Sequence, residues 1–175
     1  MERPQTLIEA EYVRTMARYN AWQNRQLTTV LADMDDDTLR ADRGAFFGSI
    51  MATLNHILWA DTIWMSRFHD RIPAPDPNGP SHLEYTPTFA VWTADRFRID
   101  GAIRLWADTL RTLDLKRRLS WYSGTLEKDM KQPLEVCVTH MFNHQTHHRG
   151  QVHAMMTAAG FKAPVSDIVF MPEDE

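Results

Sequence analysis

Apolar side chains that recur every three or four residues constrain the fold of this chain most strongly. Such spacing places them along one face of an α-helix, and it is the period with which helices pack in bundles. The clearest stripe alternates steps of three and four, is apolar at seven of its eight positions, and consists of Phe89, Trp92, Arg96, Ile99, Ile103, Trp106, Leu110 and Leu113. Three further segments carry the same signal. The sequence therefore predicts an all-α fold, a four-helix bundle with little strand.

The first two predicted helices are separated by an acidic run. The first helix extends from about Thr6 to Met34. The run Asp35–Asp37 follows it, and because acidic residues are unfavourable at a helix C-terminus we interpret this run as the start of a turn. The second helix begins within Phe46–Ser49, after a glycine, and continues to about Phe68.

The connections in the second half of the chain are of two kinds. A long proline-rich segment, IPAPDPNGPSHLEYTP, links the second helix to the third, which begins within Thr86–Thr88. Residues 117–131 are consistent with a short hairpin about Ser123 and Gly124. The fourth helix opens near Pro133 and ends at Gly160, a residue suited to the position just after a helix.

Composition limits the class of protein. A chain of 175 residues is expected to form one domain, residues 1–175. Its single cysteine, Cys137, cannot form an intrachain disulfide, and no apolar run approaches the roughly 20 residues of a membrane span. The first residues are acidic and polar, unlike a signal peptide, so we expect a cytoplasmic protein without a membrane partner. The net charge of −4 argues against nucleic-acid binding.

Histidines carry most of the functional information, since five of the eight fall between His140 and His153. On a helical wheel, the face of the fourth helix predicted to be buried consists of Leu134, Cys137, Met141, His144, His148, Val152, Met155 and Ala159. His144 and His148 are one turn apart on this face, the geometry by which one helix supplies two imidazoles to one metal ion. His140 and His147 lie toward one flank, and His153 points away.

Two interpretations of this pair remain open at this stage. The histidines either bind a metal ion or form a hydrogen-bonded polar network in the core. A metal would need a third ligand from another helix, and His56, among apolar neighbours in the second helix, is the candidate. His69 and His82, at a helix end and in the proline-rich segment, are interpreted as solvated.

Other catalytic motifs are absent from the sequence. We find no nucleophile elbow, no phosphate-binding glycine loop, no CxxC and no HExxH. Neither His56 nor His148 has the glutamate three residues earlier that di-iron bundles use. Cys137 and the tryptophans are interpreted as packing residues.

Three segments resemble the DinB-like family, also called the DinB/YfiT-like metalloenzymes. They are YNAWQNRQL, GSIMATLNHILWADTIWMSRF and THMFNHQTHHRGQVHAMMTAAG, and the last is the most specific. The resemblance implies an up-down-down-up four-helix bundle, a homodimer, and a divalent metal, nickel or zinc. It places the metal ligands at His56, His144 and His148, and it implies that low-molecular-weight thiols serve some members as co-substrates.

The resemblance and the histidine pattern together favour one function over two others. The favoured hypothesis is a metal-dependent transferase that activates a small thiol for attack on an electrophilic small molecule. A metal-dependent hydrolase is the second, although Asp61 lies on the far side of its helix and no general base is evident. The third is a non-catalytic metal-binding stress-response protein. We also expect a homodimer because the second helix has two apolar faces.

Overall fold

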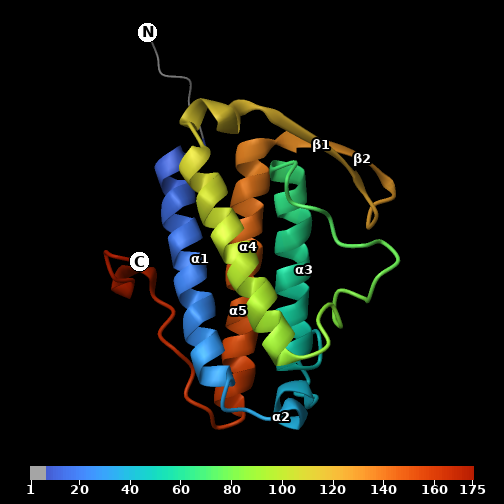
Figure 1. The fold of residues 1–175 in the computed structure, drawn as a ribbon, viewed down its shortest axis with the longest axis vertical. Coiled ribbons are helices and arrows are strands. Elements are labelled where there is room, and N and C mark those ends of the chain that lie inside the picture. Colours follow the sequence, from blue (N-terminus) through green and yellow to red (C-terminus); the bar gives the residue numbers. More distant parts are fainter. Residues whose placement is uncertain (1–6) are drawn as a thin grey trace.

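The computed structural model describes residues 7–175, and its secondary structure is predominantly helical (Figure 1). Within these residues the α-helices are α1 (Ala10–Leu31), α2 (Asp36–Arg40), α3 (Ile50–Phe68), α4 (Phe89–Thr109) and α5 (Leu134–Ala158). Strands β1 (Arg118–Ser123) and β2 (Lys128–Pro133) form one antiparallel hairpin, and short 3-10 helices span Thr112–Lys116 (η1) and Ile168–Phe170 (η2). The predicted helical fold with a hairpin before the last long helix is confirmed.

The four long helices lie side by side, with α1 and α5 running in one direction and α3 and α4 in the other (Figure 1). Helix α3 packs against both α5 and α4, and α1 packs against α4. Apolar side chains from all four fill the interior, among them Val13, Met65, Ile103 and Phe142. All three predicted metal ligands belong to α3 and α5, which pack directly against each other, and we call the side of this pair on which they lie the α3–α5 face.

The acidic run after α1 was misinterpreted as a turn. Helix α1 ends at Leu31, short of the predicted Met34, and its predicted start at Thr6 lies outside the described residues. Asp35 caps α2, since its carboxylate accepts a hydrogen bond of 2.7 Å from the backbone N–H of Thr38. Acidic residues are favourable at a helix N-terminus, so the run begins a helix.

Hydroxyl caps define the starts of α3 and α4 close to the predicted positions. The Ser49 hydroxyl accepts from the backbone N–H of Ala52 at 3.1 Å, and the Thr88 hydroxyl accepts from that of Val91 at 3.3 Å. The predicted stripe of α4 is wrong at its end. The helix stops at Thr109, so Leu113 falls in η1 and is 70% exposed.

Helix α5 ends as its sequence predicts. Gly160 adopts a φ of 82°, a left-handed conformation that suits glycine. The backbone N–H of Phe161 then reaches back to the carbonyl of Met156 at 2.9 Å, and that of Gly160 to Thr157 at 3.0 Å. Both bonds satisfy carbonyls that the helix end would otherwise leave unpaired.

The proline-rich segment and the hairpin both lie on the α3 side of the helices (Figure 1). The segment docks through the buried amide of Asn55, which donates to the Leu83 carbonyl at 3.0 Å and accepts from the backbone N–H of Thr86 at 3.0 Å. The hairpin docks through Trp121, whose ring lies 5.5 Å from that of Trp64. Two irregular segments thus border the α3–α5 face.

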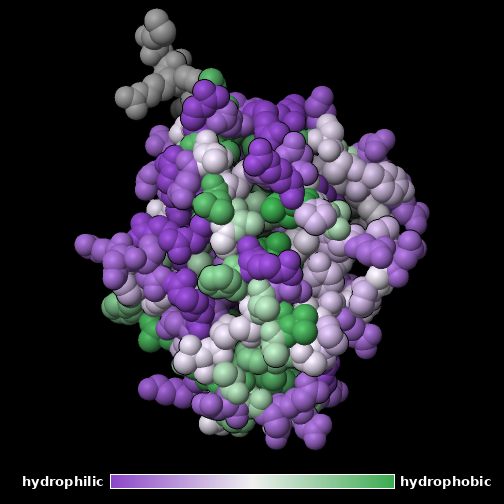
Figure 2. Space-filling view, in the orientation of Figure 1, coloured by the Kyte–Doolittle hydropathy of each residue, from purple (hydrophilic) through white to green (hydrophobic). Residues whose placement is uncertain are grey.

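Figure 2 shows the molecule from the same direction as Figure 1, with α4 in front. Hydrophilic residues dominate the face seen in Figure 2, and hydrophobic residues gather along α4. No helix within residues 7–175 is both long and apolar enough to cross a membrane.

Candidate metal centre

Three imidazoles converge where α3 packs against α5. His56 comes from α3, and His144 and His148 come from α5; one ring nitrogen of each lies within 4.8 Å of the other two. The Nε2 atoms of His56 and His144 are 3.0 Å apart, and the rings of His144 and His148 are 4.4 Å apart. The structure thus brings together the three residues that the sequence singled out.

Helical spacing and interhelical packing both contribute to this arrangement. His144 and His148 are successive polar positions of a face that is otherwise buried and apolar, including Met141 and Val152. His56 reaches them because α3 and α5 are in direct contact along their length. A third ligand therefore depends on the register between two helices, which one helix alone cannot fix.

Two of the three imidazoles are oriented by a hydrogen bond at Nδ1, the ring nitrogen that points away from the cluster. The Nδ1 of His148 donates to Oε1 of Gln151 at 2.7 Å, which leaves Nε2 with its lone pair free. The Nδ1 of His56 is 2.8 Å from the Nδ1 of His82. When His56 donates in this contact, its Nε2 also has a free lone pair, directed at the cluster. Such outer partners are typical of histidines that bind metals.

The prediction that His82 is a solvated residue is wrong. Its ring is half-buried and lies 5.4 Å from the ring of Trp59 as well as against His56. The proline-rich segment carries it there by folding back onto Asn55. The sequence offered no signal for this contact, because it joins an irregular segment to a helix 26 positions away.

Phe47 covers the cluster from the segment that precedes α3. Its ring lies 4.3 Å from that of His56 and 5.2 Å from that of His148. Phe47 falls within the predicted start of the second helix, Phe46–Ser49, but α3 begins only at Ile50. The left-handed Gly48, with a φ of 78°, turns the chain between them and directs Phe47 over the histidines.

Burial keeps the three imidazoles neutral. Desolvation, then the neighbouring His148 and His82, lowers the pKa of His56 from 6.5 to about 4. Desolvation, then the neighbouring His148 and His56, lowers the pKa of His144 to about 3. Burial also lowers the pKa of His148, although its hydrogen bond with Gln151 opposes that change. At neutral pH all three rings therefore offer lone pairs, the form in which histidine binds a metal.

The donor set fits a divalent ion of the zinc or nickel kind. Imidazole nitrogens bind zinc at about 2.0–2.1 Å, which separates two tetrahedral ligands by roughly 3.3 Å. The 3.0 Å between the Nε2 atoms of His56 and His144 is close to that separation. Among the described residues, no carboxylate or thiol joins the group. Three neutral ligands would leave the ion its full charge and at least one open position.

The remaining histidines of α5 lie outside the cluster, as the helical wheel predicts. The exposed His140 has its ring 5.7 Å from that of His144, on the side toward the hairpin. His147 is exposed, with its Nε2 3.3 Å from the side-chain amide of Gln151. His153 is half-buried about one and a half turns before the end of α5 and does not join the group.

Comparison with known proteins identifies the family. The profile described as the DinB family matches residues 1–175. The chain belongs to the DinB family. It is 23% identical over 173 residues to Protein DinB of Bacillus subtilis (strain 168), covering 95% of this chain and 98% of that protein.

A solved structure shares the fold of this DinB family chain. It is a DinB-like protein from Bacillus cereus ATCC 10987, with a TM-score of 0.61 and 17% sequence identity. The match covers 84% of this chain and 90% of the other. At this level of identity the likeness concerns the fold alone.

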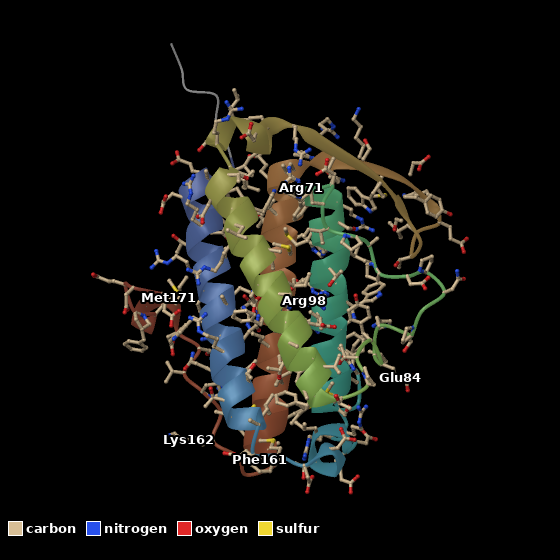
Figure 3. The ribbon with its side chains drawn as sticks, in the orientation of Figure 1. Arg71, Glu84, Arg98, Phe161, Lys162 and Met171 are labelled. Carbon is tan, nitrogen blue, oxygen red and sulfur yellow. The ribbon has the colours of Figure 1, made fainter. Side chains whose placement is uncertain are left out.

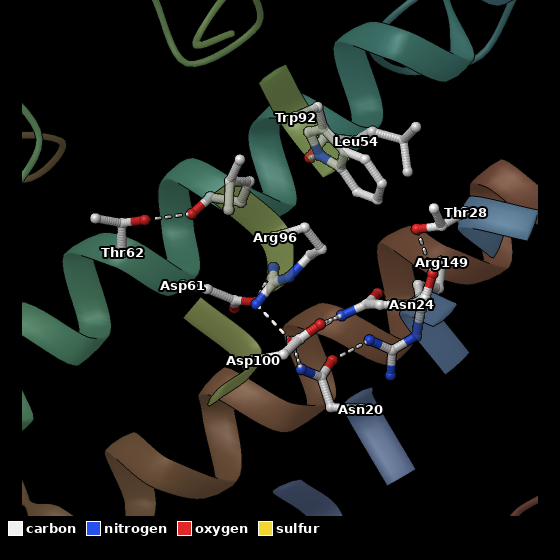
Figure 4. A network of polar contacts seen from close by, with 11 residues as sticks. Asn20, Asn24, Thr28, Leu54, Asp61, Thr62, Trp92, Arg96, Asp100 and Arg149 are labelled. Atoms are coloured by element: carbon white, nitrogen blue, oxygen red, sulfur yellow. Dashed lines mark hydrogen bonds and ion pairs between the residues drawn. The ribbon is translucent and has the colours of Figure 1, made fainter. Parts of the chain in front are cut away.

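A buried polar network occupies the interior of this DinB family chain (Figure 4). Arg96 of α4 pairs with Asp61 of α3 at 2.7 Å and with Asp100 of its own helix at 2.8 Å. Asn24 of α1 donates to Asp100 at 3.0 Å, and Asn20 accepts from Arg149. Desolvation raises the pKa of Asp61, while Arg96 opposes that change. Asp61 is therefore engaged in the core and does not face the histidines.

Proposed function

We propose that this chain is a metal-dependent transferase that activates a low-molecular-weight thiol at His56, His144 and His148. One observation carries the proposal: three neutral imidazoles converge within 4.8 Å, and no described carboxylate joins them. We interpret the scaffold as an up-down-down-up four-helix bundle, an interpretation supported by the directions of the long helices in Figure 1.

A divalent ion bound by such a set lowers the pKa of a coordinated thiol or water and so supplies a nucleophile at neutral pH. The chain's own residues prepare the site for it. Burial keeps the imidazole lone pairs unprotonated, Gln151 and His82 orient two of the rings, and Phe47 shields one side from water. Each feature favours binding of a cation whose charge is not neutralised by the protein.

The hydrolase and the non-catalytic protein are the competing assignments. Hydrolysis usually needs a general base within reach of the water, and Asp61, the acidic residue of α3, has no exposed surface and is paired with Arg96. The proposed transferase does not need such a base once the thiol has ionised. This difference is why we rank the thiol reaction first.

The test combines metal analysis with an assay. Protein purified without a histidine tag is expected to contain about one equivalent of nickel or zinc. The metal-loaded protein should conjugate a physiological thiol to an electrophile, and a chelator should abolish the reaction. Metal-dependent hydrolysis without conjugation would favour the hydrolase. Bound metal with neither reaction would favour the non-catalytic protein.

A further inference from the structure

Arg67 near the end of α3 is a half-buried cation without an anionic partner. Its Cζ atom lies 4.7 Å from the ring centre of Trp64 and 5.4 Å from that of Trp121. Within residues 7–175 its guanidinium makes no hydrogen bond and no ion pair. Arg96, in contrast, has two aspartates. Half-buried charges usually have a partner, and the partner of Arg67 is missing.

The groups that face Arg67 do not supply that partner. From α5 come the Cys137 thiol, which is buried, and His140; the hairpin contributes Trp121. Burial lowers the pKa of Arg67 and raises that of Cys137, so the thiol is protonated at neutral pH. The guanidinium lies against two indoles that meet edge to face, which leaves donor edges for a planar anion.

Arg67 lies on the same outer face as the histidine cluster. It follows His56 by three helical turns on α3, about 16 Å at 1.5 Å per residue. The two positions differ by only about 20° around the helix. A row of rings connects them, because His140 lies 5.2 Å from Trp64 and 5.7 Å from His144. Helical side chains lean toward the N-terminus, so Arg67 extends toward the histidines.

We propose that Arg67 binds a carboxylate of the thiol substrate while its sulfur lies at the histidine cluster. This inference rests on the proposed function and adds a substrate class, thiols with a carboxylate at a distance from sulfur. A carboxylate would pair with the guanidinium through two parallel hydrogen bonds. The body of the substrate would lie along Trp64 and His140. Because the sulfur must lie at the histidine cluster while the carboxylate reaches Arg67, the shortest thiol acids are excluded as substrates.

The direct test uses nickel-loaded protein and matched synthetic thiols. The probes are mercaptopropionate, mercaptohexanoate and mercaptoundecanoate, each paired with the mercaptoalcohol of equal length. Binding is followed by the sulfur-to-nickel charge-transfer absorption. At the length that spans the face, the acid should bind at least about tenfold more tightly than the alcohol. Mercaptopropionate should show no such preference. Equal binding of acid and alcohol at every length would overturn the proposal without any variant.

Two variants test whether the preference for the acid over the alcohol depends on the Arg67 side chain. Arg67→Gln should abolish it, and Arg71→Gln should preserve it. Arg71 is the matched control, since it is an exposed arginine just beyond the same end of α3 (Figure 3). The control removes the same charge from the same region, so a general electrostatic effect would appear in both. A preference that survives in Arg67→Gln contradicts the proposal.

A metal-free measurement separates this inference from the proposed function. Octanoate should change the tryptophan fluorescence of chelator-treated wild-type protein, and octanol should not. Arg67→Gln should lose that response. If no thiol binds the nickel but the octanoate response depends on Arg67, the transferase proposal fails and the anion site stands. If thiols bind the nickel and their binding does not depend on Arg67, the carboxylate site at Arg67 is refuted while the transferase proposal stands.

Discussion

The Nε2 atoms of His56 and His144 lie 3.0 Å apart although 88 positions separate the two residues in the chain. In the metal-free protein one of these nitrogens donates a hydrogen bond to the other. With an ion bound, both would direct lone pairs at it. The Nδ1 of His144 is buried without a partner, so a hydrogen-bonded network satisfies this ring only in part. An ion held by the two Nε2 atoms would leave this Nδ1 unpaired as well, so metal analysis is the measurement that separates the metal interpretation from the polar-core interpretation.

Removing any one of the three proposed ligands should release the metal. His56→Ala, His144→Ala and His148→Ala each leave two protein ligands, and metal affinity should fall by at least about a hundredfold. Metal content after dialysis measures this. His147→Ala and His153→Ala are the matched controls and should retain about one equivalent. Loss of metal in His147→Ala with retention in His148→Ala would contradict the assigned rotation of α5.

His82 should influence metal affinity although it is not a proposed ligand. His82→Ala removes the group that orients His56, and outer partners of this kind typically contribute about 10- to 100-fold in metal affinity. Competition with a metal-binding dye measures the change. His69→Ala, which alters a histidine at the end of α3 away from the cluster, should leave affinity unchanged. Equal effects of the two substitutions would show that His82 does not orient His56.

The stability of the metal-free protein should decrease in mild acid. The pKa values of His56 and His144 are about 4 and about 3 in the folded chain, against 6.5 when unfolded. Below 6.5 the unfolded chain binds protons that the folded chain does not. The stability that these residues contribute is therefore complete above pH 6.5 and is lost progressively as the pH falls through about 4 for His56 and about 3 for His144.

Urea unfolding of chelator-treated protein at several pH values tests this dependence. The double variant His56→Gln, His144→Gln removes both groups and should show a smaller decrease between neutral pH and about pH 5. Carboxylates contribute equally to both proteins, so the difference between the two curves isolates the histidines. Identical curves would mean that the two rings are already solvated in the folded state.

The parts of the site that lie within one helix could be predicted from the sequence, and the parts that depend on chain path could not. His144 and His148 follow from helical periodicity alone, because four residues make about one turn. His56 was predictable as a candidate, since its neighbours are apolar. His82 and Phe47 lie on irregular segments whose paths depend on the Asn55 hydrogen bonds and on Gly48. No periodic signal encodes such contacts.

The same distinction applies to the fold. The starts of α3 and α4 were predictable because Ser49 and Thr88 cap them with their own hydroxyls. The end of α4 was not, because Leu110 and Leu113 continue the apolar spacing while the backbone leaves the helix at Leu110. Capping competes with periodicity at helix ends, and periodicity alone overestimates helix length. Asp35 shows the opposite case, because its side chain caps the short helix α2, which is too short to have a periodic apolar pattern.

We expect the protein to be a homodimer. Phe97 and Leu105 of α4 are 76% and 72% exposed and border one groove beside α1. Burying these apolar side chains between two copies of the chain would stabilise a dimer. Light scattering should give about twice the monomer mass of 20.3 kDa. Leu105→Ser should weaken association, whereas Val169→Ser, at an exposed apolar residue near the C-terminus, should not. A monomeric mass at micromolar concentration would refute the expectation.

Arg96 should be essential for stability and dispensable for the metal. Arg96→Met leaves Asp61 and Asp100 buried without their ion-pair partner, and removing one partner of a buried ion pair costs about 3–5 kcal/mol of unfolding free energy. Urea unfolding measures that loss. Arg98→Met removes an exposed ion pair with Asp95 on the same helix and should cost at most about 1 kcal/mol. Since neither arginine contacts the histidines, the metal content of the folded fraction should stay near one equivalent in both variants. Loss of metal from folded Arg96→Met would instead mean that the network determines the α3–α5 register on which His56 depends.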